Sequence, residues 1–484
     1  MERDVRLSIV QSILETPHRK LDALLPTHVD AEQHDPLFYI KFALWYHTNG
    51  NIRDHNKLFA AKAITSEWPE FRDVGAELLY RMSNKDFVTT SKFAETFLKA
   101  GTAARYRRLK KVAERIIRRL EKRANKDGGV QFLRTAKFIK SIYQHYHIKP
   151  GNDKIAASLK FRSINGEKLP AFTMIDRIRK ENLTEKEICQ LISDWKLPPL
   201  QTIGAVKELT PAIAASLLPS MTSAETVNFM KLFERRGLLD HPDFKRAVIK
   251  KTSKSTKSSS MRSKKASKSL SKHSDVADAS TAAFVKSLPM IDKKVVLAID
   301  KSFSMQKAID IGKEVATILA AKVRDANNNL RVCLFDDTVK EIDIPEKADY
   351  ASFEAKFRFI RANGTTSLGS VIEYIDDQNI CPEVVLFITD ADESDIPLLN
   401  TSLNNVKDRE WVQGLKIINC KVGTPCFDLN ISQDMRAELS LEIENIKYDG
   451  DYYALPNLVK LIATGGIRDL IREIDQIDPF GYFN

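Results

Sequence analysis

The first half of the chain repeats apolar residues with the period of an α-helix. Apolar positions recur three or four residues apart over 7–14, 37–45 and 57–64, which predicts amphipathic helices there. Turn-forming residues separate such segments, as at 127–129. Short helices joined by short turns over residues 1–250 predict an α-helical array of HEAT-like type, although the sequence has no repeat of fixed period.

A different pattern begins after residue 275. Short apolar or β-branched runs alternate with helical segments, and these runs have the length and composition of buried parallel strands. Strand–helix alternation predicts a doubly wound, Rossmann-like α/β domain over residues 276–484. The expected strands lie at 295–299, 330–335, 383–389 and 415–422.

Serine and lysine make up almost all of residues 251–275. Such a segment buries too little apolar surface to offset its conformational entropy, so we expect a disordered linker. Two interpretations stay open for it: a basic arm that adds phosphate contacts, or a tether that is merely soluble.

The composition is that of an ordinary globular protein, with 43% hydrophobic and 29% charged residues. We find no apolar run of membrane-spanning length and no N-terminal signal segment, so no membrane partner is expected. The five cysteines are scattered, which favours reduced thiols in a cytoplasmic protein over disulfides or structural zinc.

Charge is distributed unevenly along the chain. The formal net charge of +11 combines +22 over residues 1–275 with −11 over residues 276–484. A positive field of this size attracts polyanions, and nucleic acid is the commonest polyanion in a cell. The alternative is a helical protein whose lysines and arginines are simply solvated.

One expected helix, over residues 104–124, carries most of this argument. It has a single apolar stripe and is basic on its other faces, which costs helix stability unless a polyanion covers them. Tyr143 and Tyr146, downstream, would suit base stacking or could equally lie in the core. The candidate RNA-binding residues are Arg105, Arg108, Lys111, Arg115, Arg118, Arg119, Lys122, Arg134 and Lys137.

Hydroxyl and carboxylate residues follow the expected strands of the α/β domain. Asp300, Ser302 and Ser304 come directly after one strand and Asp390 after another, while Thr365 lies in a glycine-containing loop between them. Because ligand sites of doubly wound sheets lie at the carboxyl ends of the strands, we expect these five residues to converge. Their oxygen atoms would suit Mg²⁺ or another divalent cation.

This pattern resembles the metal-ion-dependent adhesion site of von Willebrand factor A domains. The resemblance covers residues 290–484 and implies that Ser302, Ser304 and Thr365 ligate the metal while Asp300 and Asp390 supply charge and orient waters. It also implies that an acidic group from a protein partner completes the metal shell. Phe303 departs from the family, which usually has a small residue at this position.

A basic helical array joined to such a domain resembles the Ro 60 kDa autoantigen family, whose helical region is called TROVE. The resemblance implies a ribonucleoprotein scaffold that binds small noncoding Y-like RNA or misfolded RNA, with a protein partner, such as a nuclease, at the metal site. Phosphate-loop, H-E-x-x-H and G-x-S-x-G motifs are absent, so we expect no enzymatic activity. The alternative is a metal-dependent protein-interaction adaptor that binds no RNA.

Overall fold

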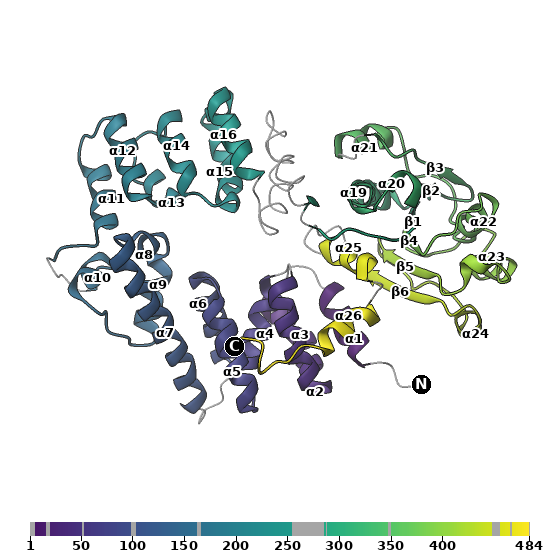
Figure 1. The fold of residues 1–484 in the computed structure, drawn as a ribbon, viewed down its shortest axis with the longest axis horizontal. Helices are drawn as coiled ribbons and strands as arrows, with labels where there is room; N and C mark the ends of the chain where they lie inside the picture. Colours follow the sequence, from purple (N-terminus) through teal and green to yellow (C-terminus); the bar gives the residue numbers. More distant parts are fainter. Residues whose placement is uncertain are drawn as a thin grey trace. The chain divides into compact units, whose positions relative to one another are not determined.

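The chain forms two compact units (Figure 1). A helical unit comprises Lys20–Phe284 with Ile477–Asn484, and an α/β unit comprises Val285–Gln476 with Met1–Arg19. A helical array followed by a six-stranded α/β sheet confirms the predicted fold class. The computed structural model describes residues 5–15, 20–50, 53–97, 103–161, 166–253, 285–286, 288–346, 350–447, 455–464 and 467–483.

The helical unit is built from helices that pack mainly against near neighbours in the sequence. Thus α4 packs against α5 and α6, α5 against α7, and α15 against α16. No described helix combines the length and the apolar composition that a membrane crossing needs. The helices are α2 (Leu21–His34), α3 (Pro36–Asn49), α4 (Arg53–Thr65), α5 (Pro69–Arg81), α6 (Asn84–Glu95), α7 (Ala103–Asp127), α8 (Val130–Arg134), α9 (Ala136–His145), α10 (Asp153–Ser158), α11 (Pro170–Lys180), α12 (Glu185–Trp195), α13 (Pro199–Ile203), α14 (Pro211–Leu217), η1 (Leu218–Ser220), α15 (Ser223–Arg235), η2 (Leu238–Asp240) and α16 (Pro242–Thr252).

Local sequence signals fix where several of these helices begin. Proline occupies the first turn of α3, α5 and α11, where its missing N–H costs nothing. Thr184 caps α12 by accepting a hydrogen bond from the backbone of Glu187, whose side chain bonds back to Thr184. Such reciprocal capping typically stabilises a helix by about 1 kcal/mol.

A buried histidine lies in the aromatic core formed by α2, α3 and α4. Nδ1 of His28 is 2.8 Å from the hydroxyl of Tyr39, and its Nε2 is 2.8 Å from Nδ1 of His55. Burial lowers the pKa of His28 well below its usual range, and the nearby His55 and Lys62 lower it further. The folded protein therefore holds His28 neutral.

We expect the helical unit to lose stability on mild acidification. The stabilising contribution of neutral His28 is complete above the unfolded-state pKa of about 6.5 and is lost as the pH falls toward the lowered folded-state pKa. The free energy of unfolding should fall by up to about 1.4 kcal/mol per pH unit in that window. Urea unfolding at pH 7.5, 6.5 and 5.5 measures this slope. His28→Gln should flatten it, whereas the exposed-site control His34→Gln should not; equal slopes in all three proteins would contradict the assignment.

The α/β unit contains one sheet with the strand order β3-β2-β1-β4-β5-β6. All neighbouring strands are parallel except the β2–β3 pair. The strands are β1 (Val295–Asp300), β2 (Leu330–Phe335), β3 (Val339–Glu341), β4 (Val384–Thr389), β5 (Lys416–Lys421) and β6 (Glu442–Lys447). The helices are α1 (Val5–Glu15), α19 (Gln306–Lys322), α20 (Ala326–Asn329), α21 (Tyr350–Phe357), α22 (Gly369–Asp377), α23 (Leu399–Asn405), η3 (Glu410–Val412), α24 (Gln433–Glu438), α25 (Leu455–Thr464) and α26 (Ile467–Asp475).

Both faces of the sheet are covered, which is why residues 295–299 of β1 are all apolar. Val296 and Ala298 share a core with residues of α22 such as Val371. On the other face, Gly312 of α19 lies so close to Ile299 that a Cβ there would be 2.5 Å from its side chain. The sequence is thus buried on alternating sides, as a doubly wound sheet requires.

The ends of the chain depart from the predicted domain boundaries of 1–250 and 276–484. Helix α1 packs against α26 and β6 in the α/β unit, where Arg6 pairs with Asp475 at 2.7 Å. The C-terminal tail belongs to the helical unit, where the hydroxyl of Tyr482 is 2.7 Å from that of Thr48. An amphipathic pattern shows which face of a helix is apolar but not which element covers it.

The predicted linker lies almost wholly outside the described residues. Helix α16 continues to Thr252, so the start of the expected 251–275 segment is helical. The prediction of disorder from residue 254 onward falls on residues that the structure does not describe.

Candidate metal site and candidate nucleic-acid interface

Asp300 is the carboxylate at the centre of the predicted metal site, and it is fully buried. It ends β1, which lies between β2 and β4, so it emerges at the carboxyl edge of the central parallel strands. One carboxylate oxygen accepts a hydrogen bond from the hydroxyl of Thr389 at 2.6 Å, and the other accepts one from the backbone N–H of Ser302 at 2.8 Å. These bonds hold the carboxylate in a single orientation.

A second carboxylate, Asp390, directly follows the neighbouring strand β4. Burial raises the pKa of Asp300 to about 6 against the hydrogen bonds from Thr389 and Ser302, and the charge of Asp390 adds to the rise. Burial also raises the pKa of Asp390, while the side chain of Ser304 hydrogen-bonds to it and acts the opposite way. Asp300 is fully buried and Asp390 is half-buried, and the negative charge of each disfavours ionisation of the other. A cation bound between two such carboxylates would relieve this repulsion.

The loop that carries Thr365 is tied to the loop after β1. The backbone N–H of Phe303 donates to the carbonyl of Gly364 at 3.1 Å. The hydroxyl of Thr365 donates to a carboxylate oxygen of Asp395 at 2.7 Å. Sequence reasoning did not select Asp395, because its position in the loop after β4 matches no spacing rule. The three predicted loops therefore meet, with Asp395 as an additional acidic residue.

The predicted ligands fit a hard divalent cation. Thr365 donates its proton to a carboxylate, and Ser304 is hydrogen-bonded to one, so the hydroxyl oxygens keep lone pairs for a cation. In the described part of the chain, no group of three or more His, Cys, Asp and Glu residues could hold a metal ion. A metal at this edge would thus depend on hydroxyl oxygens beside the carboxylates, a donor set that suits Mg²⁺. When bound, Mg²⁺ would offer a positive charge to an incoming acidic group.

Apolar side chains surround the candidate metal site. Phe303 is 85% exposed, so its ring contacts little of the protein and does not pack over Asp300. Ile396 is 77% exposed in the loop after β4. Phe427, also exposed, is held by its N–H, which donates to the carbonyl of Asp390 at 2.7 Å. We call Phe303, Ile396 and Phe427 the apolar rim.

Helix α7 has the amphipathic character that its sequence predicts. Its apolar stripe is buried, and the intervening positions are largely exposed. Lys111 and Lys122 are exposed there, and Lys137 is exposed on α9. Among the described residues, no carboxylate forms an ion pair with these three lysines. Arg105 lies within α7, but its side chain is outside the described residues. The buried stripe is Leu109, Val112, Ala113, Ile116, Ile117 and Leu120.

Several predicted RNA-binding arginines of α7 instead contact α5. The guanidinium groups of Arg115 and Arg119 lie 3.9 and 4.2 Å from the ring centroid of Tyr80. Arg115 also pairs with Glu77 of α5, but its side chain is 58% exposed, so this ion pair lies at the surface. Such pairs stabilise a fold by only about 0–1 kcal/mol and leave the cation able to bind another anion. The ion pairs are Arg108–Asp73 at 2.6 Å and Arg115–Glu77 at 2.9 Å.

A buried carboxylate links α7 to the core. Glu121 accepts hydrogen bonds from Arg118 at 2.6 Å, from the hydroxyl of Tyr143 at 2.7 Å and from the N–H of Gly151 at 2.7 Å. Tyr143 and Tyr146 are both buried. The core interpretation of these tyrosines is therefore right, and base stacking on them is excluded in this conformation.

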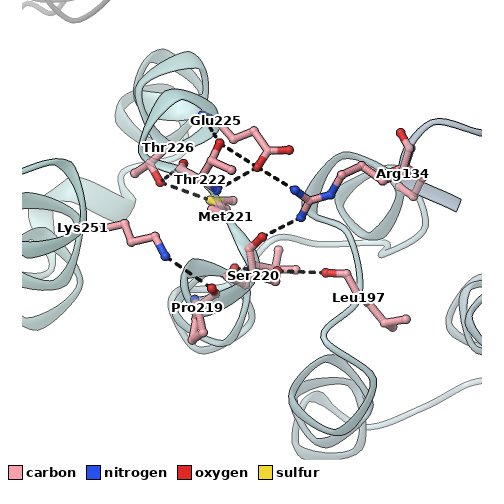
Figure 2. A network of polar contacts seen from close by, with 11 residues as sticks. Arg134, Leu197, Pro219, Ser220, Met221, Thr222, Glu225, Thr226 and Lys251 are labelled. Carbon is pink, nitrogen blue, oxygen red and sulfur yellow. Dashed lines mark hydrogen bonds and ion pairs between the residues drawn. The ribbon is translucent and has the colours of Figure 1, made fainter. Parts of the chain in front are cut away.

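Arg134 has a structural role that its basic character did not reveal. One of its terminal nitrogens is 3.3 Å from Glu225, and the other donates to the carbonyl of Ser220 at 2.6 Å (Figure 2). Gln201 donates to the carbonyl of Arg134 at 3.2 Å. The side chain thus joins α8 to η1 and α15, which lie about ninety residues later in the sequence.

The chain thus combines a helical array with a doubly wound α/β domain that carries a carboxylate–hydroxyl site at its sheet edge. Over nearly its whole length, the chain is similar to the crystal structure of the Deinococcus radiodurans Ro (RSR) protein. The two are 13% identical, 93% of this chain and 94% of that chain are covered, and the TM-score is 0.58. At this identity the likeness shows a shared fold, which confirms the predicted Ro-like architecture.

Other solved structures are similar at TM-scores below 0.5. One is mussel byssus proximal thread matrix protein 1 with a zinc-occupied MIDAS motif, at 14% identity over 37% of this chain and 48% of that chain, with a TM-score of 0.27. Another is a von Willebrand factor type A protein from Catenulispora acidiphila, at 16% identity over 36% and 43%, with a TM-score of 0.26. No protein-family model matches the sequence, and no curated protein matches it.

Proposed function

We propose that this protein is a cytoplasmic, non-enzymatic RNA-binding scaffold of ribonucleoprotein type. Its RNA would be small and structured, Y-like, or misfolded. The observation that carries the proposal is the full-length likeness to a Ro protein together with a basic face on α7. Lys111, Arg115, Arg118 and Lys122 are spaced by four, three and four residues, so they form one stripe along the helix. A phosphate backbone along this stripe would release counterions and gain affinity.

The α/β unit would bind a protein partner through a divalent cation. A carboxylate from the partner would complete the metal shell, while apolar side chains beside it pack against Phe303, Ile396 and Phe427. A nuclease is one such partner for a scaffold that holds misfolded RNA. The apolar rim supports binding rather than catalysis, because exposed aromatic residues around a polar centre are typical of protein interfaces.

Binding of a labelled RNA hairpin across salt concentrations tests the RNA proposal. If several lysines and arginines contact phosphates, log K should fall linearly with log salt, with a slope of about −0.9 per contact. Five contacts would weaken binding roughly 500-fold between about 50 and 200 mM salt. Fluorescence anisotropy of the full chain measures this slope. A flat salt dependence, or no binding at low salt, would reject the proposal.

A second candidate function is a metal-dependent protein adaptor without RNA. The ion pairs of Arg108 and Arg115 with α5 favour it, because they show that part of the basic charge stabilises the fold. The same titration decides between the two candidates. An adaptor would bind a protein partner in Mg²⁺ and release it in EDTA, yet show no affinity for the hairpin at any salt concentration.

A further inference from the structure

The helical unit contains a cavity of about 550 Å³ that the basic face of α7 does not explain. The end of α7, the following glycine turn, α8, the end of α12 and Ser220 line it. Its volume lies within the range of about 300–1,000 Å³ that is typical of small-ligand sites. None of its lining residues belongs to the metal site.

An indole ring forms one wall of this cavity. Trp195 ends α12 and is half-buried. It packs against the turn after α7, where Gly128 and Gly129 have φ values of +63° and +87°. A Cβ on Gly128 would lie 3.0 Å from the indole ring, and one on Gly129 would lie 2.8 Å from Leu169. Gly128 therefore allows the close approach of the indole ring, and Gly129 allows that of Leu169.

A second part of the cavity lining is held in place by the Arg134 network. Arg134 and Ser220 both line the cavity, and the bond between the guanidinium of Arg134 and the carbonyl of Ser220 is 2.6 Å long. Figure 2 shows the guanidinium group between Ser220 and Glu225. The wall is thus held by contacts between distant parts of the unit, and Arg134 acts as a positioning residue.

Positive charge predominates around the cavity. Its cationic residues are Arg123, Lys126, Arg134 and Lys196, and its acidic residues are Asp127 and Asp194. Both carboxylates already accept hydrogen bonds within the protein: Asp127 from the backbone N–H of Gly129 at 3.0 Å, and Asp194 from Gln190 at 2.7 Å. Lys126 and Lys196 are exposed, and in the described part of the chain neither has an ion-pair partner.

We propose that this cavity binds one unpaired nucleotide of an RNA strand. The base would stack on the indole of Trp195, and the phosphate of the same nucleotide would contact Lys126 and Lys196. Proteins that bind single-stranded nucleic acid combine an aromatic surface with nearby cations, and this cavity combines Trp195 with the exposed ammonium groups of Lys126 and Lys196 in a site large enough for a nucleotide. This inference rests on the proposed function and extends it, because α7 binds phosphates irrespective of pairing whereas the cavity requires an unstacked base.

Single-stranded RNA of ten adenylates and a ten-residue abasic analogue test the assignment. The full-length protein should bind the adenylate strand more tightly than the abasic strand, since stacking on one aromatic residue changes affinity by roughly 5- to 150-fold. Trp195→Ala should remove this difference, and Trp195→Phe should restore most of it. AMP should compete with the adenylate strand for the cavity, while inorganic phosphate, which has no base, should compete much less.

Two lysine variants keep the test valid if Trp195→Ala disturbs folding. Lys126→Glu and Lys196→Glu change exposed residues, and the control Lys231→Glu reverses an exposed charge on α15 that does not line the cavity. The first two should weaken binding of the adenylate strand more than the control does. Equal effects of the three variants, a Trp195→Ala protein that still prefers adenylate, or competition by phosphate as strong as by AMP would overturn the inference.

Binding to a blunt RNA duplex, which has no unpaired base, distinguishes failure of the cavity assignment from failure of the RNA-binding proposal. The Trp195→Ala protein should bind the duplex as tightly as the original protein does. If the original protein binds neither duplex nor single strand, the RNA-binding proposal itself fails. If it binds both and the cavity variants leave single-strand binding unchanged, only the cavity assignment fails.

Discussion

Replacing Lys111 and Lys122 together with glutamate should weaken binding of an RNA hairpin about 100-fold, or about 2.7 kcal/mol. Each change removes a phosphate contact and adds a repulsive charge. Both residues are exposed on α7 and have no ion-pair partner among the described residues, so their replacement spares the packing against α5. The slope of log K against log salt should also become less steep by about two. Anisotropy titrations at several salt concentrations measure both quantities.

The control for this double variant is Lys186→Glu with Lys231→Glu. These exposed lysines lie on α12 and α15, and their reversal changes the net charge by the same amount. A smaller loss in the control would locate the interface on α7 rather than in the overall field of the unit. Equal losses would mean that α7 is not the binding face. Reversing Arg115 and Arg118 is a weaker test, because it would also break their pairs with Glu77 and Glu121.

Asp300→Ala should abolish Mg²⁺ binding by the α/β unit. In the original protein, Mg²⁺ at about 100 times its Kd should add about 2.7 kcal/mol to the free energy of unfolding. For a unit of this size, that corresponds to a rise in Tm of roughly 5 to 10 °C. The rise should disappear in the variant, because the one fully buried carboxylate among the five predicted ligands is gone. Thermal unfolding and calorimetric titration with Mg²⁺ measure the two effects.

Two further variants show whether a loss of Mg²⁺ binding comes from the missing charge of Asp300. Asp300→Asn keeps the side-chain size near Thr389 and Ser302 but removes the charge, so it should fold and still fail to bind Mg²⁺. Asp434→Ala removes an exposed carboxylate on α24 and should leave Mg²⁺ binding unchanged. Two outcomes would remove the cation from the proposed mechanism. One is that Mg²⁺ does not change the stability of the original protein, and the other is that Asp300→Ala still binds Mg²⁺.

The sequence was sufficient for features that depend on local pattern. Asp300 follows an apolar run with the length and composition of a buried strand, and strand–helix alternation then places Asp390 at the same sheet edge. The apolar stripe of α7 follows from helical periodicity alone. Short elements with weak patterns were missed, notably the edge strands β3 and β6, since edge strands are less apolar.

Features that depend on partners distant in sequence could not be predicted. Arg134 reads as a surface cation, yet its guanidinium meets Glu225 and Ser220, which are brought near only by the folded array. Likewise, the cavity needs Lys126 and Trp195 to meet across a glycine turn, and neither residue carries a motif. Hydrophobic pattern determines which face is buried, whereas these contacts depend on how elements are stacked.

Each of the two units is built from two separate stretches of the chain, so a single cut cannot separate them cleanly. The backbone passes from one unit to the other three times, after Arg19, after Phe284 and after Gln476. A protease cut between residues 254 and 284 would therefore produce two fragments that each contain part of both units. The first fragment would keep α1, which covers β6, and the second would keep the tail whose Phe483 ring lies 4.5 Å from the guanidinium of Arg81. The nicked protein should stay associated through these exchanged ends, and expression of either half alone would leave an uncovered surface on each unit.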